Sequence, residues 1–600
     1  MAACIVAVLL VLAVCALLLA RDARAASRAL TSAGDRMPAL EAAASGDGDP
    51  AALSAQLAAL QRDTGEARAA TGGPLWAAAA HLPAVGPTLH AVAVIAAALD
   101  DVAHDVAPVL VDARETVALT ARTPDGGLDL DALRAVAPRV QQADATLTDV
   151  RSRLGQIDAD EVMDPLAQPM ETLRGRVDDL ASTVATADRA ATLLPAMLGA
   201  DGPRTYLLLA MNNAELRTAG GIPGALALLR ADGGRIEVVR QVSTGEVGPF
   251  PTPVLPLDPQ AAAVFTERLG THVQDLTLTP EFPTTATLAA GMWAASQGED
   301  VDGVLATDPV ALAHLLRVTG PVEVAVPPDA AARFGSPTVT VGPDDAVALL
   351  ENQIYTVLEP EQADAFYAQV TAAVLGRLGS PDIAPADVLP ALRQAAAERR
   401  LLVWSARPDE RQRLDGTLLA GAFLSSPSAA GALGVFLDDT VVGKMTWYLD
   451  SSVHLVSSRC TAQGRLDTVD VTLASTAPAD AGTVLPRYVA GPPGGDVPPG
   501  TVRAVLRVAA PRDADAPRLQ RDPGGAAIPL GAQTARLDGR HLASTTVTLA
   551  PGDSTTVRVE SLLPHAATAA PGGHPTTLDV WSTPTAHAGG LLSAPVPACG

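Results

Sequence analysis

Residues 204–235 hold an apolar run that stops at a polar segment and resumes after two glycines. The first run covers residues 206–211, and the second covers residues 224–229. Apolar runs of this length, bounded by turn residues, are typical of buried β-strands. Residues 231–235 form a turn signal before a third run, residues 236–241, which favours a hairpin. The stretch therefore predicts a strand, a polar loop and a hairpin, and it indicates a fold with a buried sheet.

The polar loop between the first two runs is the strongest candidate for a binding site, because strands fix its ends and loops carry much of protein function. Amide groups suit sugar hydroxyls, a carboxylate suits a divalent cation, and a guanidinium suits phosphate. The glycines permit unusual backbone geometry or close approach of a ligand. The alternative is that these side chains only satisfy their own backbone turns. The candidate residues are Asn212, Asn213, Glu215, Arg217, Gly220 and Gly221.

A second polar group surrounds the apolar run at residues 303–307. Asp300, Asp302 and Asp308 resemble an oxygen-rich magnesium set. Asp308 precedes a proline and is better explained as a helix cap, while Asp302 remains open between a ligand and a turn residue. Residues 301–326 together predict strand, helix and strand, which suffices for a crossover between parallel strands. The zinc-protease, CxxC and phosphate-loop signatures are absent from the sequence.

The N-terminus is expected to set the compartment, because residues 2–20 are uncharged and strongly apolar. Their length suits a membrane helix at the short end of the usual range, and a cleaved signal peptide is the alternative. Arginines at 21, 24 and 28 follow the segment, against the simplest form of the positive-inside rule. Long domains translocate largely regardless of such charges. We therefore expect a single-pass signal anchor in the cell membrane, with the bulk of the chain extracytoplasmic.

We expect a multidomain α+β protein. The segments are an anchor or signal segment at 1–24, a helical stalk or bundle at 25–200, an α/β domain at 203–434 and an all-β sandwich at 435–600. The last region has many short, partly alternating strands between Pro/Gly-rich turns. Cys460 and Cys599 are the cysteines outside the apolar segment, so an oxidised pair is expected in an extracytoplasmic protein. The net charge of −24 argues against nucleic acid as a partner.

Four stretches of the chain resemble the family catalogued as domain of unknown function 4012, which occurs mainly in actinobacterial envelope proteins. They are YLLLAMNNAELRTAGGIPGALALL, EFPTTATLAAGMW, DVDGVLATDPVALAHLLRVTGPV and GVFLDDTVVGKMTWYLD. The order of elements is also similar, more faintly, to the LytR-CpsA-Psr phosphotransferases. That second resemblance implies an α/β domain of their kind, polyprenyl-pyrophosphate donors and Mg²⁺. The sequence lacks a counterpart of their later paired-arginine motif.

Three functions follow as hypotheses for a protein of the cell wall. The leading one is recognition of an envelope glycopolymer or its lipid-linked, polyprenyl-pyrophosphate precursor. The second is a divergent magnesium-dependent glycopolymer phosphotransferase that uses Glu215, Arg217 and Asp302. The third is a non-catalytic envelope scaffold. The enzyme hypothesis requires those three side chains to converge on one open site.

Overall fold

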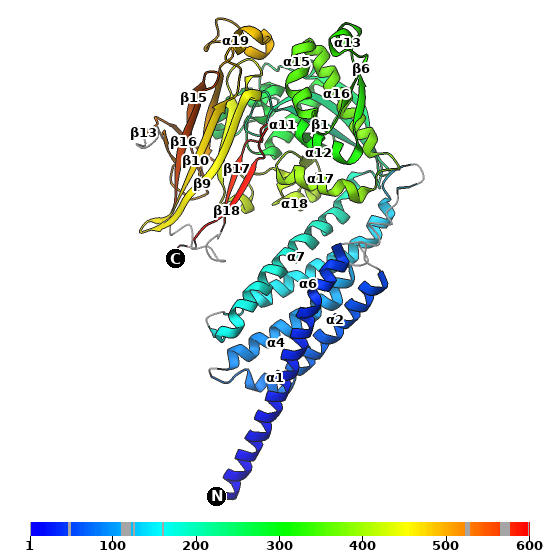
Figure 1. Cartoon of the computed structure of the whole chain (residues 1–600), viewed down its shortest axis with the longest axis vertical. Coiled ribbons are helices and arrows are strands. Elements are labelled where there is room, and N and C mark those ends of the chain that lie inside the picture. Colours follow the sequence, from blue (N-terminus) through cyan, green and yellow to red (C-terminus); the bar gives the residue numbers. More distant parts are fainter. Residues whose placement is uncertain are drawn as a thin grey trace. The chain divides into compact units, whose positions relative to one another are not determined.

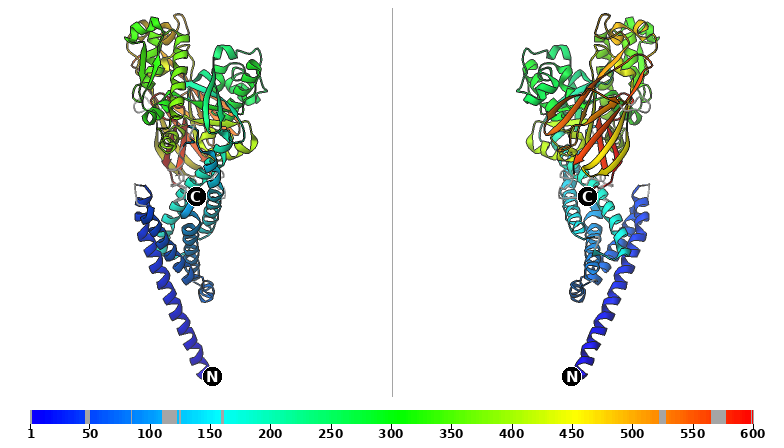
Figure 2. Two further views of the ribbon diagram at one scale, coloured as in Figure 1. Left: turned by 90° about the vertical axis from the view of Figure 1, so that its right-hand side faces the viewer. Right: turned by 90° about the vertical axis from the view of Figure 1, so that its left-hand side faces the viewer.

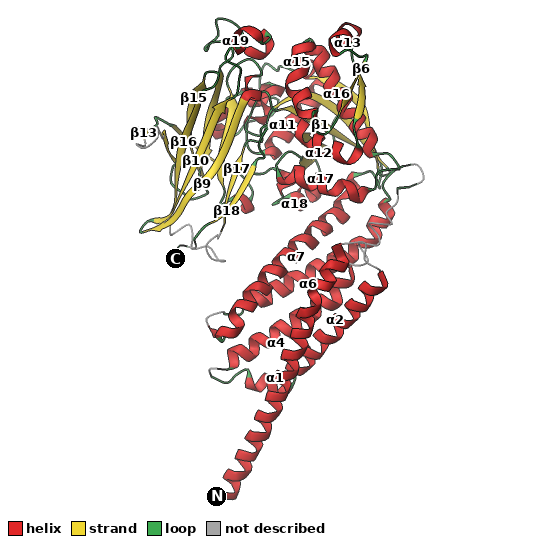
Figure 3. Cartoon of the chain, in the orientation of Figure 1, coloured by secondary structure: helices red, strands yellow, loops and turns green. Residues whose placement is uncertain are grey.

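The chain forms two compact units in the computed structural model, Met1–Ala121 with Asp129–Ala196 and Arg122–Leu128 with Met197–Gly600. The structure describes residues 2–45, 50–83, 85–109, 122–123, 126–158, 161–521, 528–564, 577–597 and 599. The mixed α and β class expected from the sequence is confirmed: in Figure 3 the first unit shows red helices, and the second unit shows both red helices and yellow strands.

The first unit is helical, as the composition of residues 25–200 predicts. Its long helices are α1 (Ala2–Ser45), α2 (Pro50–Thr71), α4 (Gly86–Asp101), α6 (Leu130–Gly155) and α7 (Asp164–Met197), coloured blue to cyan in Figure 1. The short α3 (Pro74–Ala79) and the π-helical η1 (Val102–Val106) lie between them in sequence. Leu147, Val150 and Leu154 recur on one face of α6 and are buried, as helical spacing requires. The role of this unit as a stalk stays a prediction.

The expected membrane segment, residues 2–20, forms the beginning of α1. The side chains of residues 2–12 lie outside those that the structure describes. Within the described part of the chain, no helix combines the length and the apolar character needed to cross a membrane.

The second unit is built on a five-stranded sheet in the order β3-β2-β1-β4-β7. Its strands are β1 (Arg204–Asn212), β2 (Ile222–Asp232), β3 (Arg235–Ser243), β4 (Gly303–Thr307) and β7 (Leu402–Ser405). The strand, loop and hairpin predicted from residues 204–241 are confirmed, since β1, β2 and β3 pair antiparallel in succession. Strand β1 lies at the centre and pairs parallel with β4, which explains its continuous apolar run.

Helices cover both faces of this sheet. Side chains alternate along β1, so neighbouring residues of this strand pack against helices on opposite faces. Leu207 and Leu209 pack in the same cluster as buried residues of α11 (Phe282–Gln297). Ala210 packs in another cluster, with residues of α12 (Pro309–Thr319), α16 (Pro360–Leu378) and α17 (Pro385–Ala397). The shorter helical segments are α8 (Thr244–Val247), α9 (Pro259–Phe265), α10 (Arg268–Thr271), η3 (Val273–Leu278), α13 (Pro328–Phe334), α14 (Ala346–Ala348), η4 (Leu349–Gln353), α15 (Ile354–Val357), α18 (Pro408–Leu414), η5 (Leu418–Ala420), η6 (Pro427–Ala429) and η7 (Met445–Tyr448).

The predicted crossover at residues 301–326 is wrong in its pairing. Strand, helix and strand form where expected, as β4, α12 and β5 (Val322–Ala325). However, β5 pairs antiparallel with β6 (Thr338–Val341) in a separate sheet of two strands, and the parallel neighbour of β4 is β1. Buried and exposed residues alternate along β5. A strand with one polar face suits a half-exposed pair of strands, whereas a parallel sheet covered on both faces needs continuous apolar strands.

The expected β-sandwich forms from two larger sheets. One has the order β13-β12-β16-β10-β9, and the other has the order β14-β15-β11-β8-β17-β18. Their strands, coloured yellow to red, run side by side in Figures 1 and 2. The bounds are β8 (Leu433–Asp439), β9 (Leu449–Thr461), β10 (Gly464–Ser475), β11 (Val502–Ala509), β12 (Arg518–Arg521), β13 (Ile528–Pro529), β14 (Gln533–Leu537), β15 (Arg540–Leu549), β16 (Ser554–Pro564), β17 (Thr577–Ser582) and β18 (Leu591–Pro595), with the short helices α19 (Ala481–Val484) and α20 (Arg487–Ala490).

One hydrophobic core joins the sheet of β1 to the sandwich. It contains Leu207 and Trp293 from the first of these parts, and Phe436 and Trp581 from the second. The residues expected as two domains, 203–434 and 435–600, accordingly lie in one compact unit. A disulfide between Cys460 at the end of β9 and Cys599 confirms the predicted pairing.

Candidate functional site

The polar loop begins where Asn212 ends β1, and this side chain makes two internal hydrogen bonds. Its amide Nδ2 donates to the hydroxyl of Tyr355 at 2.7 Å. Its Oδ1 accepts from the backbone N–H of Ala214 at 3.0 Å, the local turn that asparagine favours. The interpretation of Asn212 as a residue that satisfies its own turn is therefore supported.

Asn213 is fully buried, and the loop at this point is held by Glu351 of η4. The carboxylate of Glu351 accepts from the N–H of Asn213 at 3.1 Å and from that of Ala214 at 2.7 Å. Burial raises the pKa of Glu351 to about 8. Sequence reasoning missed Glu351, although a single carboxylate within the apolar stretch at residues 346–358 is a signal that could have found it.

Glu215 faces inward and forms an ion pair with Lys444, the only lysine of the chain. The ammonium of Lys444 also lies 4.2 Å from the ring centre of Tyr355 and 5.0 Å from that of Tyr488. The side chain of Lys444 is 3% exposed, so the carboxylate and the two rings replace its water. A single lysine in an arginine-rich chain was a second signal that sequence reasoning left unused.

Arg217 is directed at an internal carboxylate. Its Nη2 lies 3.1 Å from Asp275, and its Nη1 donates to the backbone carbonyl of Leu216 at 3.0 Å. The next residue, Thr218, donates through both its N–H and its hydroxyl to Asp438, at 2.7 and 2.9 Å. The guanidinium predicted to bind phosphate thus has an anionic partner within the protein.

Gly220 and Gly221 allow a backbone conformation that other residues could not adopt. A β-carbon on Gly221 would lie 2.1 Å from the carbonyl oxygen of Asn212, a distance that no side chain tolerates. Gly220 has a φ of 135°, in the region that favours glycine. Of the two roles that the sequence left open for these glycines, the structure accounts for the backbone geometry.

Asp302 lies at the opposite end of β1 from the loop. Its carboxylate accepts from the N–H of Thr205 at 2.9 Å and pairs with Arg204 at 3.1 Å. The loop follows the other end of this nine-residue strand, and a strand rises about 3.3 Å per residue. Asp302 therefore does not converge with Glu215 and Arg217, and the geometry that the phosphotransferase hypothesis requires is not present.

The other predicted metal ligands are also apart. Asp300 is exposed, while Asp308 is buried, caps α12 through the N–H of Ala311 and pairs with Arg400 at 2.6 Å. The interpretation of Asp308 as a helix cap is confirmed. Among the residues that the structure describes, no group of three or more His, Cys, Asp or Glu side chains is placed to hold a metal ion.

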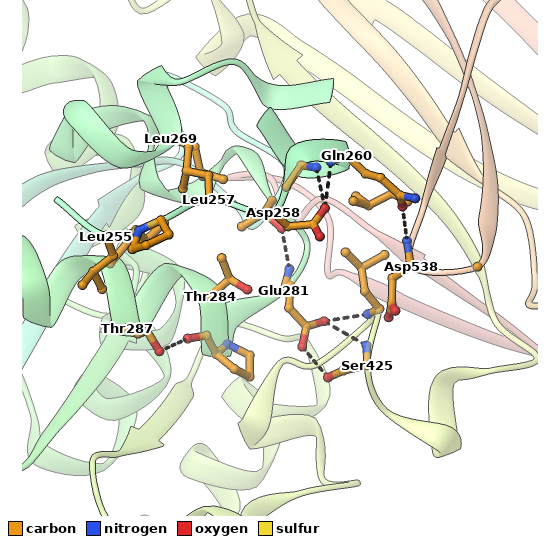
Figure 4. A pocket seen from close by; sticks show the side chains of 18 residues that line it. Leu255, Leu257, Asp258, Gln260, Leu269, Glu281, Thr284, Thr287, Ser425 and Asp538 are labelled. Atoms are coloured by element: carbon orange, nitrogen blue, oxygen red, sulfur yellow. Dashed lines mark hydrogen bonds between the residues drawn. The ribbon is translucent and has the colours of Figure 1, made fainter. Parts of the chain in front are cut away.

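A cavity of about 780 Å³ lies elsewhere in the second unit, and we call it the Glu281 cavity. Its wall combines the proline-rich segment before α9, the first turns of α11, residues 424–425 and the turn between β14 and β15. In Figure 4, Leu255, Leu257 and Leu269 lie on one side, and Gln260, Ser425 and Asp538 lie on the other. Sequence reasoning did not predict this site, because its wall is assembled from segments up to about 280 residues apart, as in the hydrogen bond between Gln260 and Asp538.

Glu281 is the buried acid of the cavity. Its carboxylate accepts from the N–H groups of Leu424 and Ser425 at 2.7 and 3.2 Å, and from the hydroxyl of Ser425. Burial raises the pKa of Glu281, and these hydrogen bonds oppose the rise. The carboxylate thereby fixes one wall of the cavity, and it joins residues 424–425 to the start of α11.

Other polar groups of the wall keep hydrogen-bonding capacity. Asp258 caps α9 by accepting from the N–H groups of Gln260 and Ala261 through one oxygen, Oδ1. Gln260 uses its Oε1 to accept from the N–H of Asp538 at 3.2 Å. In the described part of the chain, neither the Gln260 amide nitrogen nor the Thr284 hydroxyl has an internal partner. The cavity can therefore offer both donors and acceptors to a ligand.

Comparison with known proteins gives one family. Residues 201–355 match the family described as "Protein of unknown function (DUF4012)". A crystal structure of protein gbs0355 from Streptococcus agalactiae is 12% identical, with a TM-score of 0.23, over 38% of this chain and 76% of that one. The search of curated proteins found no match. The matched residues include the loop motif and both strands around it, so this region of the chain is similar to the DUF4012 family.

Proposed function

We propose that this protein is a membrane-tethered binding protein of the bacterial cell envelope, which recognises a wall glycopolymer or its lipid-linked precursor in the Glu281 cavity. The observation that carries the proposal is the cavity itself, about 780 Å³ between the α/β part and the sandwich. Ligand sites commonly lie at such junctions and have volumes of roughly 300–1,000 Å³.

Two further features support the proposed location in the cell envelope. The disulfide between Cys460 and Cys599 suits a protein exposed to an oxidising environment. The apolar run at residues 2–20 suits a signal anchor that exports the remainder of the chain.

A phosphotransferase of the LytR-CpsA-Psr kind is the weaker proposal. Its candidate cation-binding and phosphate-binding residues, Glu215 and Arg217, pair with Lys444 and Asp275 inside the protein, and Asp302 pairs with Arg204 at the far end of β1. A catalytic constellation needs its groups within reach of one reacting atom. Recognition needs only the cavity, and we therefore prefer it.

The test combines topology with binding. A C-terminal alkaline phosphatase fusion should be active, which requires export of that end. The detergent-solubilised full chain should bind glycopolymer released from cell walls, as measured by calorimetry. Thr284→Trp, which fills the cavity from α11, should weaken binding at least tenfold.

Thr356→Trp is the matched control, because Thr356 is exposed on α15 outside the cavity. An inactive fusion would overturn the envelope location. Equal binding by both variants would overturn the cavity as the site, and no binding by the unaltered protein would favour the scaffold hypothesis.

A further inference from the structure

The charge of the Glu281 cavity restricts its ligand. Asp258, Glu281 and Asp538 contribute carboxyl groups, and none of the described residues that line the cavity is Arg, Lys or His. Arg512 pairs with Asp538 at 2.8 Å from outside the lining. A phosphate or pyrophosphate placed here would meet carboxylates without a cation of its own, which is unfavourable in a partly enclosed site. The cavity therefore disfavours phosphorylated groups.

The open polar groups fit hydroxyl ligands. A hydroxyl both donates and accepts a hydrogen bond. The Asp258 carboxylate has one oxygen beyond the cap of α9, and the Gln260 amide nitrogen can donate. The Thr284 hydroxyl can do both, from the N-terminal turn of α11. Each capability of a sugar hydroxyl thus has a partner on the wall.

Part of the wall is apolar and suits the carbon face of a sugar ring. Six leucine side chains contribute to it: Leu255, Leu257, Leu269, Leu288, Leu424 and Leu537. A ligand with hydroxyls at its edge and C–H groups on its face would satisfy both kinds of surface. A simple hydrocarbon would leave the polar groups unpaired, at a cost in affinity.

We infer that the Glu281 cavity binds a phosphate-free saccharide through its hydroxyl groups, a conclusion that rests on the proposed recognition of a wall glycopolymer. The sugar portion of the polymer or precursor enters the cavity, and any phosphate or pyrophosphate stays outside it. This assigns the ligand contacts to Asp258, Gln260 and Thr284, and not to the loop after β1.

The experiment divides the natural ligand pool by charge. Oligosaccharides released from cell walls by mild hydrolysis are separated on an anion exchanger into an unretained, phosphate-free fraction and a retained, phosphorylated fraction. Binding of each fraction to the full chain is followed by saturation-transfer NMR and calorimetry. The unretained fraction should bind, and Thr284→Val, which removes only the hydroxyl, should weaken it roughly 3- to 10-fold.

Thr356→Val is the control and should leave the affinity unchanged. The urea midpoint of each variant is measured beside its affinity, so that a loss of folding is not mistaken for a loss of contact. Binding of the retained fraction alone would overturn this inference and leave the proposed function standing. If Thr284→Val and Thr284→Trp both bind the unretained fraction as tightly as the unaltered protein does, the saccharide binds outside the Glu281 cavity. If neither fraction binds, the proposed function fails as well.

Discussion

Glu351 and Lys444 decide how the loop after β1 is held, although neither belongs to the loop. Glu351 accepts from two consecutive backbone N–H groups, and Lys444 neutralises Glu215. A buried carboxylate and a buried ammonium are costly unless each has partners of this kind. The residues that the sequence presents as a binding site are therefore mainly internal partners of these two groups.

The pH dependence of stability should report on Glu351. Its folded-state pKa is raised to about 8 by burial, so the folded protein keeps a proton that the unfolded chain releases near pH 4.5. The stability linked to this proton is fully present below that lower value and is lost as pH rises through about 8. The urea midpoint of the protein should fall as the pH is raised from 5 to 9. The urea midpoint of Glu351→Gln should fall less steeply over the same range. Equal slopes for the two proteins would contradict this assignment.

Gly221→Ala should unfold or strongly destabilise the second unit. The new β-carbon would lie 2.1 Å from the carbonyl oxygen of Asn212, and neither residue can move away easily because Asn212 ends β1 and Gly221 directly precedes β2. We expect a loss of about 3 kcal/mol or more in the free energy of unfolding. Gly431→Ala is the control, because no atom lies within 4 Å of its β-carbon position, and its urea midpoint should barely change. A midpoint for Gly221→Ala like that of the control would refute the role of this glycine.

At the scale of elements, local sequence patterns predict a helix or strand correctly where that element depends on its own residues. The apolar runs around the loop predicted β1, β2 and β3, and the Asp-Pro pairs predicted the starts of α9 and α12. Pairing between distant elements was not predictable: β5 joins β6, and β1 lies beside β4. The Glu281 cavity was missed for the same reason. Its wall depends on which segments meet, and no local periodicity encodes that.

The disulfide between β9 and Cys599 should stabilise the sandwich. It closes a sequence separation of 139 residues, and a cross-link of that size restricts the unfolded chain by about 2–5 kcal/mol. The double variant Cys460→Ser/Cys599→Ser should lower the urea midpoint accordingly. Cys15→Ser, in α1 of the first unit, should leave the unfolding of the sandwich unchanged. An unchanged midpoint in the double variant would show that the cross-link adds nothing to the native packing.

At the scale of the whole molecule, the second unit shares one core across two sheets that the sequence suggested were separate domains. Phe423, for example, packs against Phe436 and Trp581, with ring centres 5.2 and 5.4 Å apart. A core of this kind couples the opening of the sheet of β1 to the opening of the sandwich.

Hydrogen exchange should reveal this coupling. The slowest amides of β1 and β11 should open with the same free energy and respond equally to low concentrations of urea, because both strands contribute to one cooperative unit. Exchange is measured by mass spectrometry on the full chain. The amides of α6, in the first unit, serve as an independent reference. Protection of β11 that persists after β1 has opened would restore the two-domain interpretation.

The long reach of the loop has a consequence for synthesis of the protein. Asn213 donates to the carbonyl of Pro584, which follows it by 371 residues. A ribosome adds ~5–20 residues per second, so the wait lasts roughly 20–75 s. During that time β1 and β2 are already made, while their connecting segment still lacks its later partners. Translation speed therefore sets how long this hairpin waits for those partners.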